Sequence, residues 1–399
     1  MSAVTSPQPP VLAAAGQHGN TAHSDGGWAL VPVQTRSERF TSVDPAAFDA
    51  VTGLEADWKL TPVAIVRPLI DGVLDGSPYQ YSSTETEGTS LEWVDRSDVR
   101  VGAAGMPEEK ASANAWSTFE KALSITLSGE ETAHVTVNRS ALGGHARAAH
   151  TLITAKPNSN ATVVLQNSGS ALLSENVEIV VEDGANLTVI SVQEWDGSAV
   201  HLASHFARVG RDARLKHIVV SLGGKVVRVN PSVHLVEAGA DGQLFGLYFA
   251  DAGQHLEQRV YVHHVAPNTI SRVNYKGALN GAGARTVWVG DVLIGPDAAG
   301  TDSYEANRNL VLSEGTRADS IPNLEIECGD IVGAGHASAT GRFDDEHLFY
   351  LQARGIPEDK ARRLVVLGFL TEIIQKIGKG DLESRLLEAI EIELGGVAA

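Results

Sequence analysis

The chain has 399 residues, a hydrophobic content of 43% and a formal net charge of −18 at pH 7. Such a chain buries a core, and its negative charge disfavours binding to nucleic acid or to an anionic membrane surface. The sequence has no run of about 18 apolar residues to span a bilayer, and it lacks the basic-then-apolar order of a secretory signal. We therefore expect a cytoplasmic protein whose partners are proteins or small molecules.

The N-terminal third of the chain has two different patterns. Residues 1–26 mix Pro, Ala, Gly, Ser and His without periodicity, and we predict a disordered tail there. Residues 27–122 are predicted to form a mostly helical N-terminal domain. The evidence is a short amphipathic segment at Asp44–Leu54 and helical spacing of apolar residues at Glu108–Leu123.

Residues 123–342 consist of short runs of β-branched and apolar residues separated by Gly, Asn and Asp turn signals. A loose repeat is visible, in which a turn ending in alanine precedes an alternating strand, at Ala185, Ala213 and Ala240. The copies follow one another at intervals of about 28 residues, as in solenoid coils. We predict a mainly β protein with a parallel β-helix or similar β-solenoid core. An antiparallel sandwich or jelly roll is the alternative.

Residues 343–399 return to helical periodicity. A helix is predicted after Pro357, and the glycines around Lys379 end it before a second helix that begins near Asp381. The resulting αα-hairpin is too short to be stable alone. Its apolar stripe has to pack on the end of the solenoid, on a second copy of the chain or on another protein.

Several ordered motifs occupy the second half of the chain. They are His264-Val265-Ala266-Pro267, Lys276-Gly277, Tyr304–Ser313, Pro322–Ile326 and Gly335–Asp344. Together they resemble the SufB/SufD family of the SUF iron–sulfur cluster assembly system. The similarity is clear over residues 255–378 and weaker back to about Ala111.

The resemblance implies a right-handed parallel β-helix core between N-terminal and C-terminal helical regions. It also implies partners, because SufD pairs with the related SufB, and the C-terminal helical domain of each holds the SufC ATPase. For this chain the SufC contacts are expected at the C-terminal helices, at Leu364, Val365, Phe369 and Ile373.

His336 is the candidate site residue. The resemblance implies that the nascent cluster forms at the SufB/SufD interface with a SufB cysteine and glutamate and a SufD histidine, and the matching position here is His336. We therefore expect His336 to be a metal ligand shared with SufB. Without the resemblance, a single histidine in a Gly- and Ala-rich stretch is more often an ordinary loop residue.

Two local features favour the SufD type within the family. SufB-like chains have glutamate directly after the histidine, whereas this chain has Ala337, and residues 290–308 contain no cysteine. Cys328 is the one cysteine of the chain, and we expect it to be a buried small residue on a strand. Because a cluster usually needs about four thiolate or imidazole ligands, the chain is expected to hold none stably alone.

The predicted function is a non-catalytic scaffold or assembly subunit of the SUF complex. The resemblance also implies that a reduced flavin is associated with the assembled complex, although the sequence has no Gly-rich dinucleotide loop. One alternative is a carbohydrate-active β-helix enzyme, a lyase or hydrolase, since fold alone does not decide function. Another is a homodimer, either of the isolated chain or acting as a scaffold like SufB.

Overall fold

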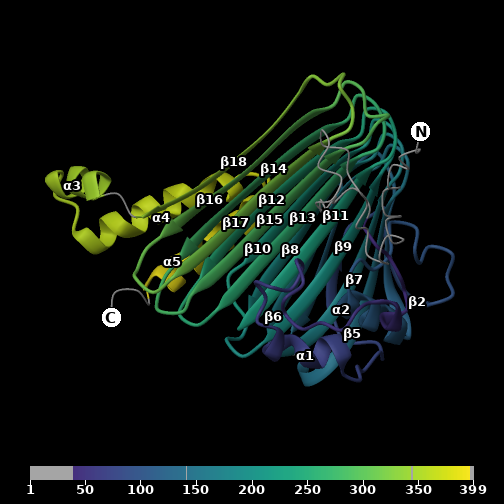
Figure 1. Ribbon diagram of the computed structural model, residues 1–399, viewed down its shortest axis with the longest axis horizontal. Helices are drawn as coiled ribbons and strands as arrows, with labels where there is room; N and C mark the ends of the chain where they lie inside the picture. Colours follow the sequence, from purple (N-terminus) through teal and green to yellow (C-terminus); the bar gives the residue numbers. More distant parts are fainter. Residues whose placement is uncertain (1–38, 141, 343–344, 396–399) are drawn as a thin grey trace, which may run out of the picture.

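The computed structural model describes residues 39–140, 142–342 and 345–395, and the predicted tail over residues 1–26 lies outside them. Figure 1 shows long strands running side by side through the molecule, with helices near the beginning and the end of the chain. The protein is mainly β, as predicted.

The strands form two nine-stranded sheets. Sheet I contains, in spatial order, β1 (Ser82–Glu85), β4 (Ala133–Ser140), β6 (Asn160–Gly169), β8 (Asn186–Trp195), β10 (Arg214–Ser221), β12 (Asp241–Ala250), β14 (Ile270–Leu279), β16 (Asp302–Val311) and β18 (Gly333–Arg342). Sheet II contains β2 (Thr89–Asp95), β3 (Lys121–Leu127), β5 (Gly143–Ala155), β7 (Ala171–Val181), β9 (Val200–Val209), β11 (Val226–Leu235), β13 (His255–His264), β15 (Arg285–Ile294) and β17 (Arg317–Ile326).

The two sheets together form a β-solenoid of about eight turns, which confirms the predicted core. From β3 onward, consecutive strands alternate between the sheets, and each strand pairs in parallel with the strand two positions later. Within the described residues, antiparallel pairing between named strands occurs at the first turn, where β1 pairs with β4 and β2 with β3. The alternative of an antiparallel sandwich or jelly roll is therefore wrong.

The repeated turns seen in the sequence stack on one another. The backbone amide of Arg211 donates to Oδ1 of Asp183, 28 residues earlier in the chain. Positive φ angles recur in successive turns, where an Asn or Asp alternates with glycine at Asn158, Gly184, Asp212, Gly239, Asn268 and Gly300. Glycine is also required for space, because a Cβ on Gly239 would overlap the carboxylate of Asp212 in the preceding turn.

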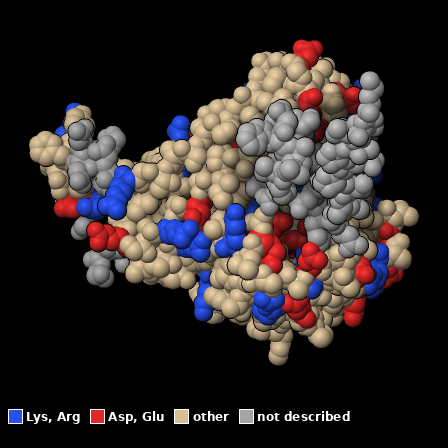
Figure 2. All heavy atoms as spheres, in the orientation of Figure 1, with Lys and Arg blue, Asp and Glu red and all other residues tan. Residues whose placement is uncertain are grey.

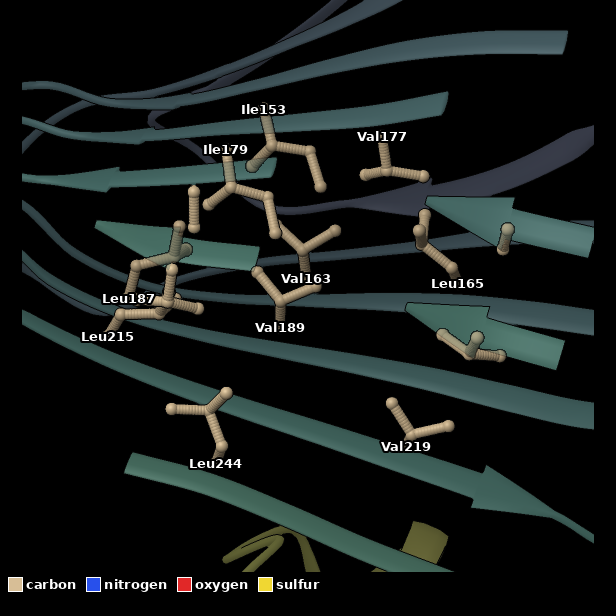
Figure 3. Close-up of a cluster of buried hydrophobic side chains, with 14 of the residues drawn as sticks. Ile153, Val163, Leu165, Val177, Ile179, Leu187, Val189, Leu215, Val219 and Leu244 are labelled. Carbon is tan, nitrogen blue, oxygen red and sulfur yellow. The ribbon is translucent and has the colours of Figure 1, made fainter. Parts of the chain in front are cut away.

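Apolar side chains fill the space between the two sheets (Figure 3). Val163, Leu165 and Val189 from sheet I point toward Ile153 and Ile179 from sheet II, and each is at most 3% exposed. Burial of one such side chain contributes about 1.5–3 kcal/mol. Because each turn repeats the same inward positions, the core is a column that runs along the solenoid.

The N-terminal region contains less helix than predicted for residues 27–122. Its described part has a short 3-10 helix, η1 (Pro45–Ala47), two α-helices, α1 (Val63–Asp71) and α2 (Lys110–Thr118), and strands β1 and β2. The helices pack on the outer face of sheet II, against residues such as Val200 and Leu202, and the strands extend the two sheets. The prediction of a mostly helical domain is therefore corrected to an arm that runs along the outer face of sheet II as far as β15, where Arg39 binds Asp291.

The C-terminal region contains α3 (Asp345–Ala353), α4 (Glu358–Ile374) and α5 (Gly380–Gly395). The predicted hairpin corresponds to α4 and α5, whose buried residues, among them Leu370 and Leu386, pack on the outer face of sheet I. The hairpin thus covers a side of the solenoid, and α3 projects away from it (Figure 1). None of the described helices combines the length and apolarity that a bilayer crossing demands.

Candidate functional site

The last turn of the solenoid, formed by β17 and β18, is much less buried than the turn before it. Most of β17 is half-buried and most of β18 is exposed, whereas β15 is almost entirely buried. Among the described strands, β17 forms one edge of sheet II, with β2 at the other, and β18 forms one edge of sheet I, with β1 at the other. Each therefore presents backbone N–H and C=O groups that have no strand partner on one side. We call this last turn the open end.

His336 lies on β18 at the open end and is in register with Glu305 on β16. Residues paired in register on parallel strands lie on the same face of a sheet. Glu305 is paired in turn with Val273 on β14, and Val273 with Leu244 on β12, and both of these side chains belong to the apolar core. His336 therefore projects toward the interior of the solenoid. Its side chain is exposed because the described chain has no further turn above it.

Glu305 is a buried carboxyl group directly beneath His336 in the strand order. It is 1% exposed, and neither of its oxygens accepts a hydrogen bond of good geometry from the described residues. Burial raises the pKa of Glu305 to about 8, repulsion from Asp291 adds to this rise, and the backbone amide of Asn323 opposes it. With no cation bound, the carboxyl group therefore holds its proton at neutral pH.

A chain of polar side chains leads from the open end into the core. Tyr248 donates its hydroxyl hydrogen to Oδ1 of Asn309 at 2.9 Å and accepts from Nδ2 of Asn307 at 2.7 Å. Oδ1 of Asn307 accepts from the hydroxyl of Ser320 at 2.7 Å, and Ser338 donates to Ser320 at 2.8 Å. Inner side chains of β12, β16 and β18 are thus joined to β17 by hydrogen bonds.

The Lys276-Gly277 motif has two structural roles. Gly277 lies between Tyr248 and Asn309 in the strand register, and a Cβ there would overlap the Tyr248 ring. Lys276 points to the outer face, where its ammonium group donates to Oε2 of Glu372 at 2.6 Å and to the carbonyl oxygen of Phe369 at 3.0 Å. The motif therefore supports the inner network and also docks α4 on the solenoid.

The four predicted SufC contacts on α4 differ in accessibility. Ile373 is fully buried against sheet I, so it stabilises the hairpin and offers no surface to a partner. Val365 and Phe369 are half-buried, and the ammonium nitrogen of Lys276 lies 4.7 Å from the centre of the Phe369 ring. Leu364 is 44% exposed. The accessible apolar surface of the set is centred on Leu364.

Cys328 lies beyond the end of β17, not on a strand, and is half-buried. Its side chain packs against the core, and Sγ lies 3.9 Å from the carbonyl oxygen of Asp330. The prediction of a buried strand residue is corrected on both points. Within the part of the chain that the structure describes, no three His, Cys, Asp or Glu residues are grouped in a way that suits a metal ion.

Sequence reasoning did not single out Glu305, Asn307 and Asn309 as interior residues. In an ordinary half-buried strand, the apolar Tyr304 would face the core and these polar side chains would face water. The structure has the opposite arrangement, since Tyr304 is 46% exposed. The available signal was the alternation of three polar residues within a motif that follows buried strands.

A family model for the core domain of SufBD proteins of the SUF iron–sulfur cluster assembly system matches residues 135–369. The chain belongs to the SufBD family. The matched span includes the open end, with His336 and Glu305, and nearly all of the docking surface for α4 on sheet I.

Two mycobacterial SufBD proteins are similar over almost their whole length. A curated iron–sulfur cluster assembly SufBD family protein of Mycobacterium tuberculosis is 47% identical over 370 residues, which cover 90% of this chain and 93% of that protein. A counterpart from Mycobacterium leprae is 47% identical over 366 residues, covering 89% and 93%. A second SufBD protein of M. tuberculosis is 30% identical over 237 residues, which are 59% of this chain and 28% of that longer protein.

Proposed function

We propose that this chain is a non-catalytic, SufD-type subunit of a cytoplasmic SUF complex, in which it pairs with a SufB-type subunit and a SufC-type ATPase. The observation that carries the proposal is the open end, where two sheet edges and one exposed histidine lie together. The reduced flavin implied by the resemblance remains a prediction for the assembled complex. The comparisons give no support to the alternative of a carbohydrate-active enzyme.

The open end supports pairing with a second SufBD subunit. Two exposed edge strands are an unstable arrangement for a lone protein unless a partner adds strands or covers them. The outward-facing positions of β18 are occupied by small residues that leave the strand backbone accessible: Gly333, Gly335, Ala337 and Ala339. In the view of Figure 2, the surface where β14 to β18 lie is mainly free of charged side chains, as expected for a face that a protein covers.

His336 supports a shared site for the nascent cluster. Its imidazole is the accessible ligand at the open end, and imidazole nitrogen binds iron well. The chain's single thiol, on Cys328, is half-buried against the core. We therefore assign one ligand to this chain and assign the thiolate ligands to the SufB-type partner.

The distal part of the C-terminal region supports binding of the ATPase. On α3, Phe349 is 73% exposed and Tyr350 is 54% exposed, and Leu364 on α4 adds to this apolar surface. The guanidinium carbon of Arg354 lies 4.4 Å from the centre of the Tyr350 ring. Aromatic and arginine side chains of this kind are typical of the centres of protein interfaces.

The test of the shared site is the variant His336→Ala, co-expressed with a SufB-type subunit and the ATPase. The variant should fold and co-purify with both partners, and it should fail to mature an iron–sulfur client protein. His145→Ala is the matched control, because His145 is an exposed histidine near the other end of the solenoid. Normal maturation with His336→Ala would refute the proposed ligand.

The test of ATPase docking is Leu364→Asp. The charge should abolish co-purification of the ATPase and leave the SufB-type subunit bound. Val73→Asp is the control, since Val73 is 95% exposed and follows α1, which packs on sheet II and not beside the C-terminal hairpin. Retained ATPase binding in Leu364→Asp, or its loss in both variants, would argue against this surface.

A further inference from the structure

Glu305 is a buried acidic side chain that the proposed function does not yet use. Its immediate surroundings explain why it fits inside the solenoid but not why it is an acid. Gly290 on β15 faces it across the interior, and a Cβ at that position would overlap Oε2 of Glu305. The missing side chain of Gly290 thus makes room for the carboxyl group. Space alone would serve an apolar residue equally well.

The polar neighbours of Glu305 are already engaged with each other. The amide nitrogen of Asn307 donates to the Tyr248 hydroxyl and to the Tyr275 carbonyl oxygen, and the amide nitrogen of Asn309 donates to Oδ1 of Asn307. Within the described ranges, no lysine or arginine forms an ion pair with Glu305, and both of its oxygens are buried without a hydrogen-bond partner of good geometry. A buried carboxyl group left in this state costs stability, which selection tolerates at functional sites.

The direction of the Glu305 side chain relates it to His336. The two residues are paired in the parallel register of β16 and β18, which lie side by side, and both project into the interior. An imidazole and a carboxylate on adjacent strands at one face form the donor set that ferrous iron accepts in proteins. The solenoid is open above them, so an ion bound there would remain accessible to ligands from a second subunit.

We propose that Glu305 and His336 together form a ferrous-iron half-site, in which this chain supplies one carboxylate and one imidazole ligand. The half-site deepens the proposed function and rests on it, since the remaining ligands come from the paired subunit. It assigns to this chain the loading of iron, whereas sulfur chemistry belongs to the thiol-bearing partner. The positive ion would also compensate the buried carboxylate.

The test measures binding of Fe²⁺ alone, under anaerobic conditions, to the complex of this chain with its SufBD partner. The variants are Glu305→Gln, His336→Ala and the double variant. Each single change should weaken Fe²⁺ binding by at least about tenfold. The double variant should lose less than the product of the two single effects, because both side chains bind the same ion.

The control is Glu325→Gln, which changes a half-buried glutamate of the same last turn on β17 and should leave Fe²⁺ binding unchanged. Wild-type Fe²⁺ affinity in Glu305→Gln, or effects of the two single changes that simply multiply, would overturn the half-site. If Glu305→Gln fails to assemble, Glu305→Ala replaces it, and wild-type affinity in that variant overturns the half-site too. Client maturation by His336→Ala separately reports on the proposed function, so the two failures are distinguishable.

Discussion

Buried glutamates have opposite surroundings near the two ends of the solenoid. Near the first turns, Arg139 makes two hydrogen bonds to Glu175, at 2.6 and 2.8 Å, and His201 contacts the same carboxylate at 2.8 Å. Although burial opposes it, the charge of Arg139 and the hydrogen bond of His201 hold the pKa of Glu175 well below its ordinary value. At the open end, Glu305 is equally buried, its pKa is raised, and it has no such partner in the described chain.

The first and last turns also differ in their packing, although β1 and β2 are the outer strands of the two sheets at the first turn, as β18 and β17 are at the last. Tyr79, Tyr81 and Trp93 pack edge to face beside the core, and β1 and β2 pair antiparallel with the first parallel strands. From this difference we infer that a buried ion pair with complete hydrogen bonding stabilises the fold. A buried acid with incomplete bonding beside an uncovered sheet edge indicates a place for a ligand and a partner.

The largest loss of stability is expected from Glu175→Ala, near the first turns. Removing this carboxylate leaves the Arg139 guanidinium buried and unpaired, which should lower the free energy of unfolding by about 3–5 kcal/mol. Urea denaturation measures this loss. Glu182→Ala breaks only a surface pair with Lys156 and should cost less than about 1 kcal/mol. Equal effects of the two variants would contradict the structural role of the buried pair.

Glu305→Gln should change the free energy of unfolding in the opposite direction to Glu175→Ala. The pKa of Glu305 is about 8 in the folded chain and near the ordinary glutamate value of 4.5 in the unfolded chain, so the unfolded state releases its proton first as the pH rises. The wild-type stability contributed by this proton is complete below pH 4.5 and is lost between pH 4.5 and 8, by at most about 1.4 kcal/mol per pH unit.

Because glutamine does not titrate, the stability of the variant relative to wild type should increase across that pH range. Thermal unfolding of the two proteins at several pH values between 5 and about 8 tests this. A constant difference in stability over the range would show that Glu305 is not a buried neutral acid.

Gly277→Ala should disrupt the inner hydrogen-bond network. The added methyl group overlaps the Tyr248 ring, and the expected cost is about 1–3 kcal/mol. Gly335→Ala is the control on the outer face, where the added Cβ would lie 3.5 Å from the Tyr304 ring, an ordinary contact. Equilibrium unfolding should place this second variant within about 0.5 kcal/mol of wild type. A larger loss for Gly335→Ala than for Gly277→Ala would contradict the assigned inward and outward faces.

The smallest loss of stability is expected from a substitution where the C-terminal hairpin docks on sheet I. Lys276→Met removes an ion pair with Glu372, which is 49% exposed, and one hydrogen bond to a helix carbonyl oxygen. The loss should be about 1 kcal/mol, because water screens the exposed partner. Hydrogen exchange of the α4 amides should rise in this variant, and unchanged exchange would show that Val366, Leu370 and the other apolar contacts hold the hairpin alone.

Much of the fold was visible in the sequence because its signals are local. Turn residues such as Asp212 and Gly239 indicate positive φ angles, and the spacing of the repeats predicts stacked coils. The packing of the hairpin on the side of the solenoid was not visible, since the apolar stripe with Leu370 and Ile373 fits any apolar surface. His336 was found through the family resemblance. Glu305 was missed because its inward direction depends on the strand register and not on composition.

The most direct test of the open end as the contact for a second SufBD subunit is amide hydrogen exchange of this chain, alone and in the complex. We predict that the partner protects Arg317–Ile326 and Gly333–Arg342 strongly and leaves Ser82–Glu85 and Thr89–Asp95 unchanged. Protection confined to the strands of the first turn, with no change in the last two strands, would contradict the account.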